Sequence, residues 1–399
     1  MKEDILALFE LQGLERVLEG FEVGDKDVVL RFRESRRARC PGCGRWSRRR
    51  HARLKPRLVY HGVVFGRRIW LGLRNSRYLC RACGKPFTEV SPFIRPRQRR
   101  TQAAERAVLE ALRGRSFKSV EQREGISYGV SSRVLRRCVD PEKIAWPEGT
   151  IALGIDGHSF RGTRMVNTIT DVRARRSLTI LPDSRKDRLE RFLRDIPPEA
   201  KSRINEVCID MDTALLTAVE RELPGVPVVV DHFHLIQDAN RRVDEARKIE
   251  ADACHRELPK KLFVIGQEKL SSREKERLAR YKELYPSLKE FHWMKEKLRQ
   301  FYALRSKKTA QKKLKDLIEI ALLSDDAAMV QWGRSLRRWS PYILNFFDNR
   351  TTNAYTEGIH TKIKMIKRVS FGFRNVDIYV RKMLLCILPL TVLLPWLPH

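Results

Sequence analysis

Hydrophobic and polar residues follow different patterns in successive parts of the chain, and each pattern predicts a different kind of structure. Short strand-like runs such as Arg57–Tyr60 and Arg68–Leu73 are bounded by turn-forming residues. Between residues 101 and 138 apolar residues recur at helical spacing. Strands and helices then follow up to residue 234, and from residue 235 to residue 349 the pattern is helical throughout. The sequence therefore predicts a multidomain α+β protein.

The segment after residue 150 contains five apolar strands whose order is informative. Three follow one another, at Ile151–Ile155, Arg164–Val172 and Ser177–Leu181. Each of the other two, Ile204–Ile209 and Val226–Val230, comes after a helix. Three antiparallel strands followed by parallel strands with intervening helices is the order of a ribonuclease-H-like α/β fold.

Acidic residues stand where such a fold places a metal site. Asp156 follows the first strand and Asp210 the fourth, so we expect both carboxylates to emerge at strand ends that lie side by side. Asp231 follows the fifth strand and is an alternative second acid, while Glu357 opens a basic helix and is the natural third. An aspartate after a strand often only forms a turn, and an acid at a helix start often only favours the helix dipole. Together, however, three carboxylates predict a site for two Mg²⁺ or Mn²⁺ ions.

Two Cys-x-x-Cys-Gly turns predict one structural zinc ion. The four expected ligands are Cys40, Cys43, Cys80 and Cys83. Each spacing places two sulfurs on one tight turn, and the glycine allows a left-handed backbone that turns amides toward the sulfurs. Strand-like stretches between the turns indicate a zinc ribbon. The alternatives are unrelated free thiols, or His51 and His61 as substitute ligands.

The charge of the chain points to a polyanionic partner. There are 81 Lys and Arg residues against 49 Asp and Glu, which gives a formal net charge of +32. Residues 36–57 contain ten basic residues and no acidic one, among them Arg48, Arg49 and Arg50. A solvated basic face explains any one of these arginines, but the whole set on a zinc ribbon favours contact with the phosphates of double-stranded DNA.

The helical segment that follows the ribbon has a helix-turn-helix pattern. We expect helices over Thr101–Arg113, Ser116–Arg123 and Ser127–Cys138, with a glycine-containing turn between the last two. The third helix would then present four side chains to DNA: Tyr128, Ser131, Ser132 and Arg133. The alternative is a trihelical packing unit that does not bind DNA.

The C-terminal region combines a basic helix with an apolar end. Four cations surround the apolar face of the helix and are expected to contact DNA: Lys362, Lys364, Lys367 and Arg368. The apolar run Met383–Leu397 is interrupted by prolines and is shorter than the roughly 20 residues of a membrane span. We expect a buried helix there and no membrane contact. Scattered cysteines and the lack of a secretory signal favour a cytoplasmic, nucleoid-associated bacterial protein.

Composition and pattern together predict the domain boundaries. An N-terminal strand region with the zinc ribbon occupies residues 1–95, and the helix-turn-helix domain occupies residues 96–140. The ribonuclease-H-like catalytic core begins with residues 150–234, is interrupted by a helical insertion at 235–349, and ends with the helices of residues 350–399.

Several motifs resemble those of the bacterial insertion-sequence transposases of the ISL-three family. The most specific are Val230-Asp231-His232-Phe233-His234 and the run from Asn353 through Glu357-Gly358 to Gly372-Phe373-Arg374-Asn375. The first cysteine turn and the pairs Ile155-Asp156 and Ile209-Asp210 extend the resemblance over nearly the whole chain. Members of this family carry a zinc ribbon, a helix-turn-helix and a DDE catalytic domain.

This resemblance implies roles for individual residues. Asp156, Asp210 and Glu357 would be the catalytic triad, and the gap of 357 − 210 = 147 residues would hold the helical insertion. Asp231 and His234 match the family's D-x-x-H motif and would support the metal ligands. His360 departs from the family pattern, where an asparagine is expected.

The resemblance also implies an activity and partners. The protein would bind the terminal inverted repeats of its element, hydrolyse DNA at the element's ends and transfer the 3′-hydroxyl to target DNA. We expect it to act as a homodimer or a larger oligomer on DNA. The alternative is a catalytically silent DNA-binding regulator descended from a transposase; an RNA nuclease is disfavoured by the helix-turn-helix.

Overall fold

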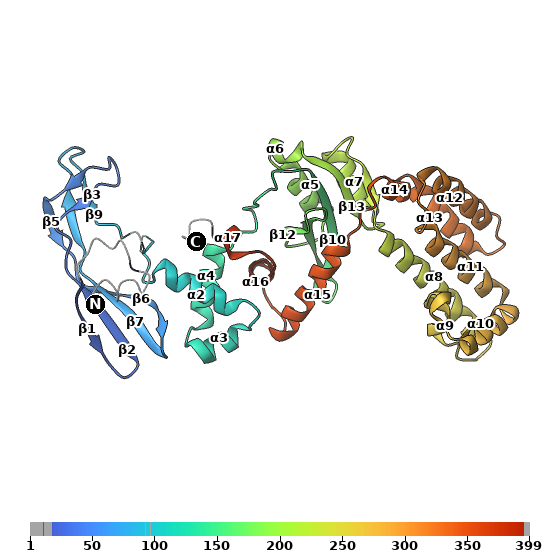
Figure 1. The fold of residues 1–399 in the computed structure, drawn as a ribbon, viewed down its shortest axis with the longest axis horizontal. Helices are drawn as coiled ribbons and strands as arrows, with labels where there is room; N and C mark the ends of the chain where they lie inside the picture. The colour runs from blue at the N-terminus through green and yellow to red at the C-terminus, as the bar shows by residue number, and fades with distance from the viewer. Residues whose placement is uncertain (1–10, 12–17, 92, 96, 395–399) are drawn as a thin grey trace. The chain divides into compact units, whose positions relative to one another are not determined.

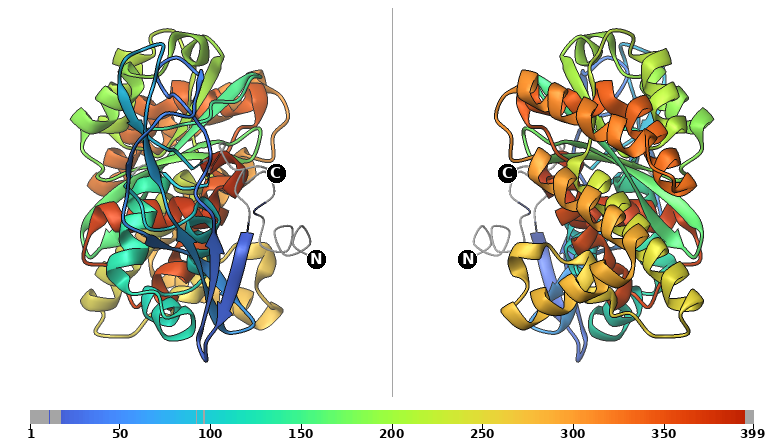
Figure 2. Two further views of the ribbon diagram at one scale, coloured as in Figure 1. Left: turned by 90° about the vertical axis from the view of Figure 1, so that its left-hand side faces the viewer. Right: turned by 90° about the vertical axis from the view of Figure 1, so that its right-hand side faces the viewer.

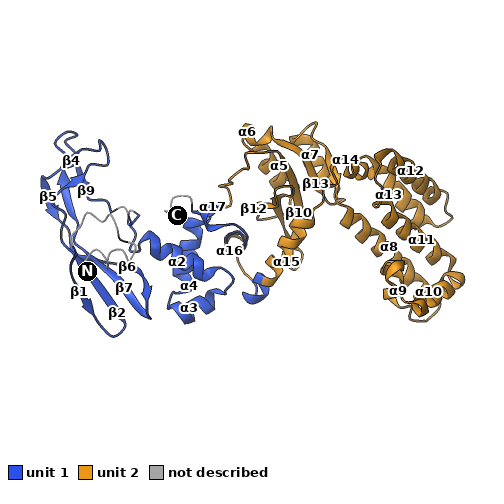
Figure 3. Ribbon diagram, in the orientation of Figure 1, with its two compact units in different colours: residues 1–140, 366–372, 381–399 blue, residues 141–365, 373–380 orange. Residues whose placement is uncertain are grey.

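The computed structural model describes Leu11 and residues 18–91, 93–95 and 97–394. The chain forms two compact units, shown in separate colours in Figure 3. The first contains residues 1–140, 366–372 and 381–399, and the second contains residues 141–365 and 373–380. The C-terminal segment 350–399, expected to close the catalytic core, is therefore divided between the two units.

A four-stranded sheet forms the base of the first unit (Figure 1). Its strands, in spatial order, are β1 (Leu18–Val23), β2 (Asp27–Phe32), β7 (Arg67–Leu73) and β6 (Arg57–Val64). The two central strands are parallel and the outer pairs are antiparallel. One face of the sheet is apolar, and Leu30, Phe32 and Leu71 are almost completely buried there.

Two small sheets continue from this base and carry the cysteine turns. They are formed by β3 (Ala38–Arg39) with β4 (Trp46–Ser47), and by β5 (Arg50–Arg53), β8 (Ser76–Leu79) and β9 (Pro86–Thr88). The first cysteine turn joins β3 to β4, and the second joins β8 to β9. Tyr78 and Phe87 stack in a small core beside the cysteines.

Three helices follow at the positions that the sequence predicts: α2 (Gln102–Leu112), α3 (Phe117–Glu124) and α4 (Tyr128–Cys138). Thr101 is the N-cap of α2, because the Ala104 amide donates to the Thr101 hydroxyl at 3.2 Å. Gly125 ends α3 with φ = 65°, a left-handed backbone conformation that costs free energy for a residue with a side chain.

The C-terminal helix α16 (Val376–Ile387) contacts this helical unit. Its buried Lys382 ammonium donates to the carbonyls of Leu112 and Arg115. A short helix, α17 (Leu390–Leu393), follows, and the end of the predicted apolar run Met383–Leu397 lies outside the described residues.

A five-stranded mixed sheet forms the centre of the second unit, in the order β12-β11-β10-β13-β14 (Figure 1). Its strands are β10 (Ile151–Arg161), β11 (Arg164–Asp171), β12 (Arg176–Leu181), β13 (Ile204–Ile209) and β14 (Val228–Val230). The first three are antiparallel, and β13 and β14 are parallel to β10. The connecting helices are α5 (Lys186–Arg194), α6 (Pro198–Lys201) and α7 (Thr213–Glu222).

The first strand of this sheet is longer than predicted. The apolar run stops at Ile155, but pairing with β11 continues to Arg161 because buried residues still alternate along it, at His158 and Phe160. Asp156 therefore lies in the middle of β10, and the prediction that it emerges at a strand end is wrong. Asp210 and Asp231 do follow directly on β13 and β14.

Residues 232–349 form a helical layer. It contains α8 (His232–Ala253), α9 (Lys260–Val264), α10 (Ser272–Leu284), α11 (Pro286–Phe301), α12 (Lys307–Leu322), α13 (Ala327–Leu344) and α14 (Phe346–Asn349), with one 3₁₀ turn at Gln267–Lys269. Figure 2 shows the yellow-to-orange helices packed together. Apolar side chains of these helices are buried between them, among others at Leu298, Phe301 and Leu317. Within the described part of the chain, we find no helix both long and apolar enough to cross a bilayer.

Candidate active site

Three acidic side chains reach one side of the central sheet from three different elements. Gly154 on β10 pairs with Cys208 on β13, so Asp156 and Asp210, each two residues further along, lie next to each other. Glu357 lies in the first turn of α15 (Ala354–Val369). Parallel neighbouring strands bring residues at equal register together, which explains why two positions far apart in sequence share this site.

The start of α15 is anchored on the sheet by buried polar contacts. The amide of Asn353 donates to Oδ1 of Asp231 at 3.3 Å, and its side-chain amide donates to the carbonyl of Ile155 at 3.4 Å. One turn further, the hydroxyls of Thr356 and Thr170 are 2.7 Å apart. Asn353 is completely buried. Its anchoring role was not recognised from the sequence, where only its place before a helix was visible.

His234, from the first turn of α8, joins the acids into one cluster. Its Nε2 atom lies 2.9 Å from Oδ1 of Asp210 and 4.0 Å from Oε1 of Glu357. The ligand atoms of Asp156, Asp210 and His234 all lie within 4.8 Å of one another, and the same is true of Asp231, His234 and Glu357. All five predicted acids and supporting residues are therefore brought together.

The electrostatics of the cluster favour a bound cation. Burial and the neighbouring Asp210 raise the pKa of Asp156 to about 7, and burial and Asp231 raise the pKa of Glu357. Burial alone would lower the pKa of His234, but the Asp210, Asp156 and Asp231 carboxylates outweigh it and raise this pKa to about 9. Without a metal, a proton shared by the carboxylates and the positive charge of His234 offset the repulsion between the acids. A divalent cation would relieve the same repulsion.

The donor atoms also fit a hard divalent ion. Carboxylate oxygens are the preferred ligands of Mg²⁺ and Mn²⁺. Oδ2 of Asp231 is buried and has no hydrogen-bond partner among the described residues. The two candidate second acids differ in access: Asp231 is fully buried, whereas a quarter of the Asp210 side chain is exposed.

One further residue touches an acid directly. Nδ1 of His360, one turn after Glu357 on α15, lies 3.3 Å from Oδ2 of Asp156. Burial and the nearby Lys364 lower the pKa of His360 to about 4, so the ring is neutral. The sequence marks this position only as a departure from a family pattern.

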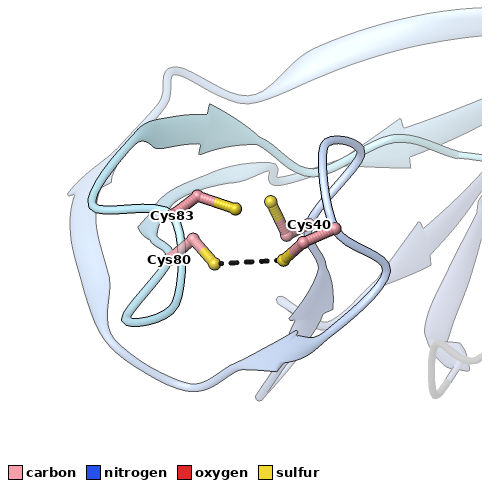
Figure 4. Close-up of side chains that lie close together, drawn as sticks. Cys40, Cys80 and Cys83 are labelled. Atoms are coloured by element: carbon pink, nitrogen blue, oxygen red, sulfur yellow. Dashed lines mark hydrogen bonds between the residues drawn. The ribbon is translucent and has the colours of Figure 1, made fainter.

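The four predicted cysteines converge at one point of the first unit (Figure 4). Their sulfur atoms all lie within 4.8 Å of one another, and those of Cys43 and Cys80 are 3.6 Å apart. A tetrahedral zinc site with Zn–S bonds of about 2.3 Å separates its sulfurs by about 3.8 Å. The cluster therefore has the size of a Cys₄ metal site. His51 is exposed, and His61 contacts Thr101 at 2.9 Å, so neither replaces a cysteine.

The two cysteine turns have the same backbone design. Gly44 donates its amide to the Cys40 carbonyl at 2.8 Å, and Gly84 donates to the Cys80 carbonyl at 2.9 Å. Both glycines have positive φ, 71° and 66°, as the motif predicts. The Cys83 amide lowers the pKa of the Cys80 thiol to about 7, whereas the hydrogen bond with Cys43 raises the pKa of the Cys83 thiol, so without a metal the thiols share protons among themselves.

Most of the basic residues that we expect to contact DNA face solvent. Arg48, Arg49 and Arg50 are exposed, although Arg50 also forms an ion pair with Glu34 at 3.2 Å. On α15 the apolar face is buried as predicted, while four cations are exposed or half-exposed around it: Lys362, Lys364, Lys367 and Arg368.

The helix predicted to read DNA exposes only two of the four side chains expected on its DNA-facing surface. Ser131 is completely buried and Ser132 is 4% exposed, so the prediction that Ser131 contacts DNA is wrong. Both serines are short enough to pack inside the three-helix unit, where Val134 and Leu135 are also buried. Arg133 and Tyr128 are exposed, as predicted.

Comparison with known proteins identifies the family. The model of the DDE transposase family of ISL-three type, described as "Transposase", matches residues 153–383, more than half of the chain. The chain belongs to this transposase family. It is also similar to the transposase for insertion sequence element IS1001 of Bordetella parapertussis, with 24% identity over 360 residues that cover 86% of this chain and 87% of the relative. The family match begins inside β10 and includes all four acids and His234 of this transposase.

Proposed function

We propose that Asp156, Asp210 and Glu357 are the catalytic acids of this DDE transposase, on a ribonuclease-H-like core. The observation that carries the proposal is their convergence around His234 from β10, the end of β13 and the first turn of α15. The sheet order and strand directions of the second unit support the assignment of the core. The exposure of Asp210 favours it over the buried Asp231 as the acid that meets substrate.

We infer that the site takes two Mg²⁺ or Mn²⁺ ions. When bound, such ions activate the attacking oxygen and neutralise charge on the leaving oxygen of an in-line displacement at phosphorus. The three acids would hold them, and His234 would orient Asp210 and Glu357. Asp231 supports the site differently: it accepts the Asn353 amide and so holds the start of the helix that carries Glu357.

The reaction we infer has two steps, each with one P–O bond formed and one broken. In the first, water attacks the phosphate at the element's end, and the 3′-oxygen of the element leaves as a hydroxyl. In the second, this 3′-hydroxyl attacks a phosphate of target DNA, and the 3′-oxygen of the target leaves. In-line displacement needs positioning and charge stabilisation, and no covalent link to the protein.

DNA recognition is assigned to the first unit and to α15. We infer that the cysteine cluster holds one structural Zn²⁺ and, together with the helix-turn-helix unit of α2, α3 and α4, binds the terminal inverted repeats. The cations proposed to contact phosphates are Arg48, Arg49, Arg50, Arg133, Lys362, Lys364, Lys367 and Arg368. We further infer a homodimer or larger oligomer on DNA, acting on the bacterial nucleoid in the cytoplasm.

An end-cleavage assay tests this function. Linear DNA that carries the element's terminal repeats and flanking sequence is incubated with the purified protein and Mg²⁺. The proposal predicts strand cleavage at the ends of the element, and none with EDTA. Asp156→Asn should bind the repeats as tightly as the unchanged protein and fail to cut. A protein that binds the repeats but cuts them with neither Mg²⁺ nor Mn²⁺ would be a silent regulator and would contradict the proposal.

A further inference from the structure

A chain of buried polar contacts connects α16 to Asp156. The hydroxyl of Tyr379 lies 2.8 Å from Nε2 of His158, and Nδ1 of His158 lies 3.0 Å from Oγ1 of Thr168. The same Thr168 hydroxyl lies 2.9 Å from Nε2 of His360. Nδ1 of His360 completes the chain with its 3.3 Å contact to Oδ2 of Asp156. Each of the five side chains is less than a tenth exposed.

The fold explains why these residues meet. His158 is two residues after Asp156 on β10 and so lies on the same face of the strand. Thr168 is the direct partner of Asp156 on β11. His360 lies one helical turn after Glu357 on α15. The chain of contacts therefore links the strand of the first acid to the helix of the third.

The chemistry of the groups permits one direction of donation when Asp156 is ionised. An ionised carboxylate only accepts, so a hydrogen bond across the 3.3 Å contact requires the proton to be on Nδ1 of His360. Nε2 of the neutral ring then accepts, and the donor to it is the Thr168 hydroxyl. Since Thr168 has one proton, it must accept from Nδ1–H of His158. Nε2 of His158 is then an acceptor, and Tyr379 donates its hydroxyl proton to it.

The opposite direction requires a different protonation state. Tyr379 would accept, each ring would carry its proton on Nε2, and Nδ1 of His360 would accept from a protonated Asp156. A protonated carboxyl group is a poor ligand for a divalent cation. Only the first direction is compatible with Asp156 as a metal ligand.

We propose that Thr168 and His158 are positioning residues of the active site, which fix His360 as the Nδ1–H tautomer that holds one oxygen of Asp156. The other oxygen would then be left to bind the metal. Tyr379 ends the chain and sets its direction. This inference rests on the proposed role of Asp156 as a metal ligand. It assigns a function to His360, the position where the family pattern has an asparagine.

Mn²⁺ binding to the full chain, measured without DNA, tests the inference. Thr168→Val keeps the shape of the side chain but removes the hydroxyl that both histidines share. It should weaken Mn²⁺ binding about 10- to 100-fold, the usual effect of losing a partner that orients a metal ligand. Thr168→Ser keeps the hydroxyl and should restore the affinity. If Thr168→Val binds Mn²⁺ as well as the unchanged protein, the inference is overturned.

A matched control separates positioning from simple loss of stability. Thr179 lies on the neighbouring strand β12, is also buried, and donates its hydroxyl to the carbonyl of Pro141 at 2.7 Å. Thr179→Val therefore removes a buried hydroxyl bond from the same sheet without touching the chain of contacts. Its Mn²⁺ affinity should be unchanged. Equal weakening in Thr168→Val and Thr179→Val would contradict the inference.

The tautomers give a second readout that a purely structural role would not produce. ¹⁵N-labelled histidine should report Nδ1–H for both His158 and His360 in the protein saturated with Mg²⁺, which keeps Asp156 ionised. Nε2–H at either ring would overturn the inference. If Asp156→Asn weakens Mn²⁺ binding but Thr168→Val does not, the positioning role of Thr168 is wrong, while the proposed role of Asp156 as a metal ligand is supported. If Asp156→Asn leaves Mn²⁺ binding unchanged, the proposed metal role and this inference fail together.

Discussion

At the level of single residues, Asp210 and Asp231 have different surroundings although each directly follows a parallel strand. Asp210 contacts His234 and is partly open to solvent. Asp231 is fully buried and accepts the backbone amide of Asn353. The sequence pattern could not separate the two, because it contains the strand ends but not the depth of each carboxylate in the fold.

This difference predicts unequal effects of two matched substitutions. Asp210→Asn removes a charge from the proposed metal site, and it should lower the rate of DNA end cleavage by about a hundredfold or more. Asp231→Asn keeps an oxygen that can accept the Asn353 amide, so it should lower the rate less. Single-turnover cleavage at saturating Mg²⁺ measures both. A dead Asp231→Asn with an active Asp210→Asn would reverse the assignment.

His292 should make the stability of the helical layer dependent on pH. It is completely buried on α11, and burial and Lys295 lower its pKa to about 3 in the folded protein. The unfolded chain takes up the proton near pH 6.5. Stability is therefore fully present above that pH and is lost as the pH falls from about 6.5 toward 3, by about 1.4 kcal/mol per unit.

Denaturation by urea between pH 7 and pH 5 measures this contribution. His292→Leu should flatten the dependence of the unfolding free energy on pH, while His255→Gln, at an exposed position, should not. An unchanged slope in His292→Leu would show that this histidine is not held neutral by the fold.

At the level of elements, local sequence patterns predict most of the strands and helices. They fail where contacts with other elements determine the length of a strand or the burial of a side chain. The strand Ile204–Ile209 follows from an apolar run, and the cap at Thr101 follows from a hydroxyl side chain placed directly before a helix. The extension of β10 past Asp156 depends on its partner β11, which no local pattern contains. The burial of Ser131 likewise depends on two neighbouring helices, because a serine can pack inside a small helical unit as well as face solvent.

The convergence of the four cysteines follows from the local spacing within the two turns, so the sequence predicts it without knowledge of the surrounding packing. Removal of the metal should therefore have a local effect. Cys40→Ser should lose one equivalent of zinc and the binding of the terminal repeats, because the small sheets around the cluster have little apolar core of their own.

The mixed sheet of the second unit carries its own apolar core and should keep its fold without that metal. Circular dichroism and metal analysis of Cys40→Ser should show loss of zinc with the helical signal retained. A preparation of the unchanged protein that contains no zinc, purified without chelators, would contradict this part of the account.

At the level of the whole molecule, the chain crosses between its two units more often than sequence boundaries suggest. Residues 366–372 and 381–399 belong to the first unit, and residues 373–380 to the second. Helix α15 accordingly carries Glu357 in its first turn and basic residues in its last. A sequence pattern marks elements in order along the chain, and tertiary contacts decide to which unit each one belongs. The formal net charge of +32 is consistent with binding of DNA along several elements.

If Asp156, Asp210 and Glu357 together form a site for divalent metal ions, as we propose, Fe²⁺ bound there should cleave the polypeptide around it. Fe²⁺ accepts the same oxygen and imidazole ligands as Mn²⁺. With ascorbate and peroxide it generates radicals that cut the backbone close to the ion. We expect cuts in β10, after β13 and in the first turn of α15, which excess Mg²⁺ suppresses and Asp156→Asn abolishes. Cuts confined to the cysteine turns, or cuts near the acids that neither Mg²⁺ nor the substitution affects, would contradict this proposal.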